Sequence, residues 1–230
     1  KKLMVVVELE NTLLQVVKSG SATKLFGSSS GVRNPDFSKE GYNVHYRRGR
    51  EEFLDTLLNK HKDKAYVGVW TSLDRNVGLL AARAYFGPYF DKLFFLNTTQ
   101  RTAVKGPSTE TTGAFPIQKV EQDLQEPEII FERFSDINEK STIVVSPFKN
   151  QLKQFEPNDV PIGFWDVEKR PQTYNDDFYI PALNYYITGI LQYAKTTKGA
   201  EFDVRAFSTR MSLDNMQKRL RDSSQFSTVA

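Results

Sequence analysis

The chain has 230 residues, a formal net charge of +3, 39% hydrophobic residues and no cysteine. A net charge this small argues against nucleic acid or an anionic membrane surface as the main partner. The absence of cysteine excludes disulfides, thiolate zinc sites and cysteine nucleophiles. With only His45 and His61, a histidine metal site has little basis.

No stretch of the sequence reaches the roughly 18–20 apolar residues of a membrane span. The nearest, at 178–194, contains Pro, Asn, Gln and several Tyr, and it predicts a packed helix. The chain begins at Lys1 and enters an apolar run two residues later. Because domains rarely start so abruptly, we expect sequence upstream of residue 1, where a targeting peptide or an anchor would fit.

Short apolar runs alternate with helical patterns along the chain. The runs predict strands at 3–7, 65–70, 93–96, 128–131, 142–145 and 162–165. Helical periodicity covers 50–62, 73–87 and 176–195. Continuous apolar runs are typical of strands covered on both faces, and their alternation with helices indicates right-handed βαβ units. The predicted fold class is α/β, a three-layer sandwich with a central parallel sheet.

Three polar segments interrupt this pattern. Residues 15–43 include a Gly/Ser-rich stretch that predicts a loop, and residues at about 97–127 form a polar insertion longer than usual loops. Residues 196–230 form a C-terminal extension with a short amphipathic helix. This helix docks either on its own domain or on a partner. We therefore predict one domain at 1–195, with the insertion, and an extension at 196–230.

Two carboxylates close the first strand. In "VVVELENTLL", Glu8 and Glu10 lie two residues apart, and Thr12 follows two further on. Carboxylates at such a strand end commonly hold a metal ion or attack a phosphate. The alternative is a solvated pair of carboxylates neutralised by Arg47 or Lys149.

Five segments in order resemble motifs of the haloacid dehalogenase superfamily, and of its branch of C-terminal-domain phosphatases and nuclear-LIM-interactor-interacting-factor-like proteins. The resemblance spans about residues 3–195. The first motif of the family is Asp-x-Asp-x-Thr after the first strand. The matching segments here are "VVVELENTLL", "NVHYRRGREEFLDTL", "VGVWTS", "STIVVSPFKNQLKQFEPNDVPIGFWD" and "DDFYIPALNYYITGIL".

The resemblance implies phosphoryl transfer through an aspartyl-phosphate, with a second Asp as general acid and base and with bound Mg²⁺. This sequence departs from that pattern at most catalytic positions. Glu8 stands at the nucleophile position and Glu10 at the acid–base position. A longer side chain moves each carboxylate by about 1.5 Å, and a shift of about 1 Å can cost on the order of 100-fold in rate. Ser146 replaces the late acidic ligand, and Glu132 falls where a phosphate-binding Lys is expected.

Only Thr71, Ser72 and Thr12 follow the catalytic pattern of the family. Thr71 and Ser72 also suit caps of the helix that begins near Asp74. From these departures we expect a protein that is not an enzyme, needs no cofactor and serves as a scaffold or accessory subunit of a larger complex. The same branch includes the presequence receptor of the mitochondrial inner-membrane translocase, so the expected location is mitochondrial, at the inner membrane.

Two alternatives stay open. One is a presequence-binding receptor, and the other is a Mg²⁺-dependent phosphoserine or phosphothreonine phosphatase with a Glu nucleophile. The expected partners are protein subunits. The candidate partner-binding residues come from the basic turn, the insertion and the C-terminal helix: Arg47, Arg48, Lys105, Phe115, Met216 and Leu220. The basic run at 218–221 is either a solvated helix face or a contact for an acidic subunit or lipid headgroups.

Overall fold

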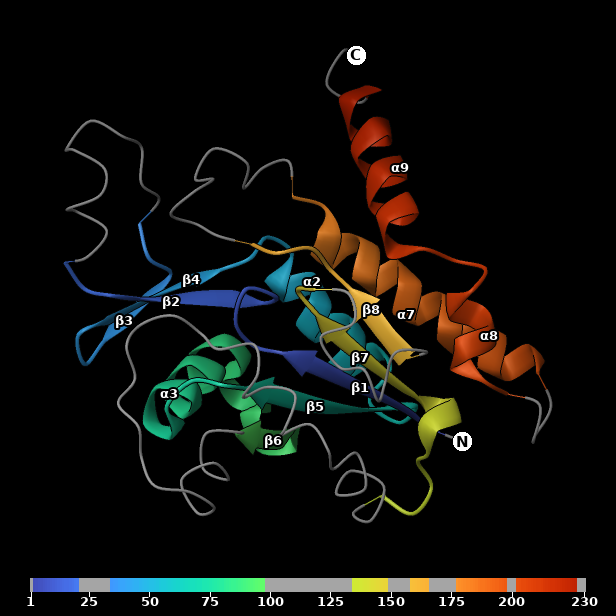
Figure 1. Cartoon of the computed structure of the whole chain (residues 1–230), viewed down its shortest axis with the longest axis horizontal. Helices are drawn as coiled ribbons and strands as arrows, with labels where there is room; N and C mark the ends of the chain where they lie inside the picture. The colour runs from blue at the N-terminus through green and yellow to red at the C-terminus, as the bar shows by residue number, and fades with distance from the viewer. Residues whose placement is uncertain are drawn as a thin grey trace.

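A computed structural model describes residues 2–20, 34–97, 134–148, 158–165, 177–197 and 202–226. Figure 1 shows the arrangement of its elements around a central sheet. The insertion predicted at about 97–127 lies almost wholly outside the described residues, as does the strand predicted at 128–131.

Among the described residues, the central sheet has five parallel strands in the order β6-β5-β1-β7-β8. Their bounds are Leu3–Glu8 for β1, Ala65–Thr71 for β5, Phe94–Asn97 for β6, Thr142–Ser146 for β7 and Asp159–Pro161 for β8. This parallel sheet flanked by helices confirms the predicted α/β class.

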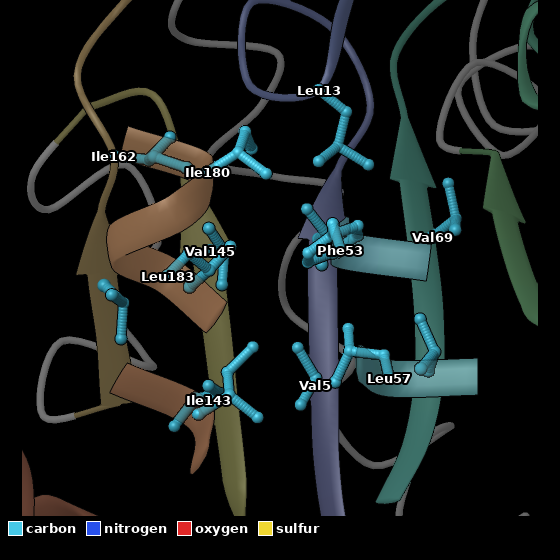
Figure 2. Close-up of a cluster of buried hydrophobic side chains, with 14 of the residues drawn as sticks. Val5, Leu13, Phe53, Leu57, Val69, Ile143, Val145, Ile162, Ile180 and Leu183 are labelled. Atoms are coloured by element: carbon cyan, nitrogen blue, oxygen red, sulfur yellow. The ribbon is translucent and has the colours of Figure 1, made fainter. Parts of the chain in front are cut away.

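The largest hydrophobic core lies between one face of the sheet and the helices. Val5 and Val7 of β1 are fully buried in it, because alternate residues of a strand point to the same face. In Figure 2, Phe53 and Leu57 lie over β1, and Leu183 lies beside Val145 of β7. The continuous apolar run at 3–7 is explained by a second, smaller cluster on the other face, formed by Met4, Val6, Phe94, Ile137 and Val144.

The helices follow the predicted periodicity. The segment predicted at 50–62 forms α2 (Arg50–Asp55) and continues as a π-helix, η1 (Thr56–Lys60). Helix α3 (Arg75–Phe86) ends at Gly87, after which a 3-10 helix, η2 (Gly87–Lys92), leads to β6. Helix α7 (Tyr179–Thr196) carries Pro181 in its first turn, where its missing N–H has no intrahelical partner to lose.

A second sheet lies on either side of the Gly/Ser-rich stretch within 15–43. It is antiparallel with the order β2-β4-β3, formed by Leu14–Lys18, Tyr42–Tyr46 and Phe37–Lys39. These short strands were not predicted from the sequence, and most of the predicted Gly/Ser-rich loop lies outside the described residues. Glu40 and Gly41 both have positive φ, as a tight hairpin turn requires.

The strand predicted at 162–165 is also wrong. Strand β8 ends at Pro161, and residues 162–165 have no regular structure. Gly163 adopts a φ of 76°, which ends the extended backbone.

The C-terminal region contributes to the main core. A 3-10 turn, η3 (Glu139–Ser141), packs against α8 (Val204–Ser208), and α9 (Leu213–Phe226) packs against α7. Buried side chains of this region join the main cluster: Phe202, Val204 and Leu213. The helix predicted in the extension is therefore present, and it docks on its own domain. The outer part of α9 extends beyond the body in Figure 1. Among the described residues, no helix is long and apolar enough to cross a membrane.

Candidate functional site at the carboxyl edge of the sheet

The strand order places a switch point between β1 and β7. From β1 the chain continues toward β5 on one side, and from β7 it continues to β8 on the other. In parallel α/β sheets, the carboxyl ends of strands at such a point are where ligands commonly bind. Glu8 ends β1 and Ser146 ends β7, so the sequence placed two of its candidate residues at this edge correctly.

A compact turn after β1 directs the next carboxylate back toward the sheet. The backbone N–H of Leu9 donates to Trp70 O at 2.7 Å, which continues the pairing of β1 with β5. Asn11 then adopts a positive φ of 56°, and the N–H groups of Leu13 and Leu14 both donate to Leu9 O. The turn brings Glu10 beside the end of β5.

Glu10 is buried among hydroxyl groups. Its side chain is 7% exposed, and its Oε2 accepts hydrogen bonds from Thr71 Oγ1 at 3.2 Å and from Ser72 Oγ at 3.4 Å. Burial raises the pKa of Glu10 to about 7, and the hydrogen bonds from Thr71 and Ser72 oppose that rise. This carboxyl group therefore exchanges its proton near neutral pH.

These contacts correct two alternatives drawn from the sequence. The interpretation of Glu10 as a solvated carboxylate is wrong, since it is buried. The interpretation of Thr71 and Ser72 as helix caps is also wrong: Asp74 caps α3 by accepting from Asn76 N at 3.0 Å. Thr71 and Ser72 instead donate hydrogen bonds to the carboxyl group of Glu10. The hydroxyl of Thr12 is buried and has no hydrogen-bond partner in the described part of the chain.

Arg47 joins the loops behind this edge. It is 2% exposed, and its Nε donates to Asp177 Oδ2 at 2.6 Å. Its remaining nitrogens donate to the carbonyls of Thr12, Ile162 and Gly163, at 3.3, 3.4 and 3.0 Å. Arg47 thus neutralises Asp177 rather than Glu8 or Glu10, and its burial does not favour direct contact with a partner.

The end of β7 carries a hydroxyl where the family pattern implies an acid. Ser146 Oγ donates to Asp159 Oδ1 at 2.9 Å and contacts Phe148 O at the same distance. Within the described residues, no three Asp, Glu or His side chains gather closely enough to hold a metal ion. Mg²⁺ requires near-octahedral oxygen ligands, usually with one or two protein carboxylates and bound waters. No step below depends on that ion.

Two phenylalanines lie exposed at the same edge. Phe148 follows β7 and is 50% exposed, and Phe164 follows β8 and is 42% exposed. Their rings stack with centroids 5.2 Å apart and planes 21° apart. Sequence reasoning missed this pair. Phe148 follows the strand predicted at 142–145, but Phe164 lies within the strand predicted at 162–165, so nothing in the sequence placed the two rings together.

The other predicted residues lie apart from this edge or outside the described residues. Arg48 is half-buried, with its guanidinium 4.7 Å from the ring centroid of Phe178. Met216 and Leu220 are half-buried and pack against the main core. Glu132, Lys105 and Phe115 fall outside the described residues, and so does Lys149. Their predicted roles stay predictions.

Comparison with known proteins gives structural matches alone. No protein-family model matches the sequence, and no curated protein matches it. One similar solved structure is that of Fcp1, an essential RNA polymerase II CTD phosphatase, with 11% identity and a TM-score of 0.43. Another is the fission yeast CTD phosphatase Fcp1 bound to beryllium fluoride, with 13% identity and a TM-score of 0.41. Each match covers 96% of this chain and 62% of the other.

The chain has an α/β fold with a central parallel sheet. At these identities the likeness concerns the fold, and it does not extend to the branch of the superfamily or to the catalytic motifs. The expectation that this chain is not an enzyme is unsupported, and it is withdrawn. Both similar structures are those of phosphatases, and no feature of the described residues demonstrates inactivity.

The contacts of Arg47 predict a large effect on stability. Arg47→Met leaves the carboxylate of Asp177 buried without its cation, and it removes the donors to three carbonyls. We expect the free energy of unfolding to fall by about 3–5 kcal/mol, measured by urea denaturation followed by circular dichroism. Arg48→Met is the matched control, and we expect it to cost less than about 1 kcal/mol. Equal losses in the two variants would contradict this role of Arg47.

The burial of Glu10 predicts a pH-dependent stability. Because folding raises the pKa from 4.5 to about 7, the folded state holds this proton more tightly than the unfolded chain. The contribution is complete below about pH 4.5 and is lost as the pH rises through 7, for a total of roughly 3 kcal/mol. Glu10→Gln keeps the neutral shape, so urea denaturation should show this variant gaining on the native protein as the pH rises. Parallel pH profiles for the two proteins would refute the raised pKa.

Proposed function

We propose that this chain is a protein-binding subunit whose haloacid dehalogenase-like body serves as a scaffold in a larger assembly. The observation that carries this proposal is the exposed, stacked pair of Phe148 and Phe164 at the carboxyl edge of the sheet. The proposal concerns what this edge binds.

The exposure of the pair has an energetic cost that a partner would remove. A phenylalanine side chain buries on the order of 200 Å² when fully covered, and each buried Å² contributes about 25 cal/mol. Rings 50% and 42% exposed therefore each forgo roughly 2 kcal/mol. Single exposed apolar residues are common, but two stacked aromatic rings form one apolar anchor, and aromatic anchors are typical of interface centres.

The polar groups beneath the pair give it a rigid base. Ser146, just before the loop of Phe148, is held by Asp159 on the neighbouring strand. Gly163, just before Phe164, is held by the guanidinium of Arg47. Because both rings follow residues held by partly buried hydrogen bonds, less conformational entropy remains to be lost when a partner covers them.

The location and the kind of assembly follow the sequence resemblance. The branch with non-catalytic members includes the mitochondrial presequence receptor, so we propose an assembly at the mitochondrial inner membrane. A stable protein subunit is the first choice for the partner. A presequence, which is a basic amphipathic peptide, is the alternative. A stable subunit would form a long-lived complex, whereas a presequence carries positive charge and would bind reversibly. Both the lifetime of the complex and the charge of the ligand can be measured.

The aromatic pair gives the test of this proposal. Native purification of the tagged chain from its own cells should recover a stoichiometric protein partner. The double substitution Phe148→Ser and Phe164→Ser should reduce that recovery at least about tenfold, since it removes the anchor. Tyr185→Ser is the matched control, because Tyr185 is an exposed aromatic residue on α7, 59% exposed. Undiminished recovery with both serines in place would end the proposal.

The buried Glu10 favours a second candidate, a phosphoserine or phosphothreonine phosphatase. A carboxyl group with a pKa of about 7 is suited to give and take a proton at neutral pH. In this candidate an oxygen of Glu8 attacks phosphorus, the ester O–P bond breaks, and the leaving alkoxide takes the proton of Glu10. Glu10 then removes a proton from water, and the water oxygen attacks the phosphorus bound to Glu8. The bond between the Glu8 oxygen and phosphorus breaks, which releases inorganic phosphate and restores the Glu8 carboxylate.

Steady-state hydrolysis of a phosphoserine peptide decides this candidate. We expect Glu8→Gln to abolish turnover, because an amide oxygen is a poor nucleophile, and Glu10→Gln to lower kcat by about 10²–10⁴-fold. Glu139→Gln is the control, as an exposed carboxylate. Assays run in parallel with Mg²⁺ and with EDTA. Turnover that survives in Glu8→Gln, or no turnover in the native protein under either condition, would reject the candidate.

A further inference from the structure

The residue after Phe164 is bonded to the turn that carries Glu10. The backbone N–H of Trp165 donates to Asn11 O at 3.1 Å, and Trp165 is buried. Asn11 follows Glu10 directly in the turn at 9–13, where its backbone is left-handed. Any displacement of this turn therefore either moves the backbone beside Phe164 or breaks this hydrogen bond.

The residue before Phe164 is bonded to the same turn through Arg47. One guanidinium nitrogen, Nη1, donates to Gly163 O at 3.0 Å and also to Thr12 O at 3.3 Å. Thr12 belongs to the turn at 9–13, so a single buried cation joins that turn to the backbone of Gly163. The position of Phe164 is accordingly set from both sides by the turn.

Glu10 is held in this turn by neutral donors. Its carboxyl group receives hydrogen bonds from the hydroxyls of Thr71 and Ser72, and from backbone N–H groups of Ser72 and Leu73. No ion pair of the described residues includes it. A buried negative charge without a cation is costly. Ionisation of Glu10 therefore favours a shift of the turn that brings the carboxylate to water.

Charged and titratable groups reach the surroundings of the turn from several elements. They are Glu8 of β1, His45 and Arg47 at the end of β4, Asp74 and Arg75 at the start of α3, Asp159 of β8 and Asp177 before α7. None of these forms an ion pair with Glu10, and Arg47 is instead paired with Asp177. Within the described part of the chain, the ionised form of Glu10 thus has no paired cation to stabilise it.

We propose that ionisation of Glu10 displaces the turn at 9–13 and with it Phe164, so that the aromatic pair binds its partner while Glu10 is protonated and releases it when Glu10 is ionised. Phe148 follows a different strand, β7, and its carbonyl is contacted by Ser146. Movement of Phe164 alone would therefore separate the stacked rings. This inference rests on the proposed protein-binding function and adds its regulation: binding weakens as the pH rises.

Fluorine NMR of the full chain tests the coupling without a partner. We place para-fluorophenylalanine at position 164, and in a second sample at position 185, which is exposed on α7. The chemical shift and the H₂O–D₂O isotope shift, which reports exposure to solvent, are followed between about pH 5.5 and about pH 8.5. Because burial raises the pKa of Glu10 to about 7, we expect both shifts to change at position 164 with a midpoint near that pH. We expect no such change at position 185.

Glu10→Gln separates Glu10 from the other titratable groups. Histidine ordinarily titrates near neutral pH, so His45 could produce a similar curve in the native chain. We expect the fluorine signals at position 164 to be independent of pH in Glu10→Gln. A response that persists in this variant, or a native chain without any response, would overturn the proposal. Circular dichroism confirms that the variant keeps the native fold.

Partner binding gives the size of the effect. With a pKa of about 7, Glu10 is protonated in roughly nine-tenths of the chains at about pH 6 and in roughly one-tenth at about pH 8. If the protonated form alone binds, the apparent Kd for the partner recovered by native purification rises by about five- to tenfold between these conditions. In Glu10→Gln the two values should differ by less than about twofold. Glu139→Gln, which changes an exposed acid, is the control that should keep the native response.

The outcomes separate this inference from the function on which it rests. If the apparent Kd depends on pH equally in the native chain and in Glu10→Gln, the inference fails. The protein-binding function stands in that case, provided that Phe148→Ser with Phe164→Ser still reduces recovery of the partner. If the serine substitutions leave recovery undiminished, the function and the inference fail together.

Discussion

The buried guanidinium of Arg47 is the interaction on which the candidate site depends. From the end of β4 it reaches the turn after β1, the segment after β8 and Asp177, two residues before the start of α7. Four parts of the chain that are distant in sequence thus share one cation. Among the described residues its charge is balanced by the carboxylate of Asp177, which also accepts from the N–H of Tyr179 at the start of α7. The geometry of the edge is therefore fixed by one ion pair and its carbonyl contacts.

The fold gives different environments to two glutamates that look equivalent in the sequence. Glu8 ends a strand and remains half-buried, whereas Glu10 is folded back by the left-handed Asn11 into a buried position. A carboxylate removed from water binds its proton more tightly, and the hydroxyls of Thr71 and Ser72 offset only part of this effect. The residues that resemble phosphate ligands of a family motif here solvate a carboxyl group. The same geometry suits either a carboxyl group that donates a proton in a reaction or a protonated carboxyl group with a purely structural role.

Much of the fold was predictable because its signals are local. The apolar runs at 3–7 and 142–145 became neighbouring central strands, and helical periodicity located α2, α3 and α7 within a few residues. The pairings were not predictable. Nothing near Arg47 indicates an ion pair with Asp177, 130 residues later, and Thr71 reads as a helix cap until the turn after β1 brings Glu10 beside it. Gly163 shows why the strand at 162–165 was misjudged: a run that is apolar in sequence ends where one glycine takes a left-handed conformation.

Gly163 restricts which residues can occupy its position in related sequences. At a φ of 76°, a side chain at position 163 would be strained, and its Cβ would lie 3.1 Å from the ring of Tyr179, so the ring would have to shift slightly. The tyrosine hydroxyl is what meets Asp214, so the identity of one residue after β8 is linked to the seating of a helix some fifty positions downstream. Divergent sequences that retain glycine here, with tyrosine and aspartate at the matching places, can be recognised as sharing the docked C-terminal helix even where their overall similarity has faded.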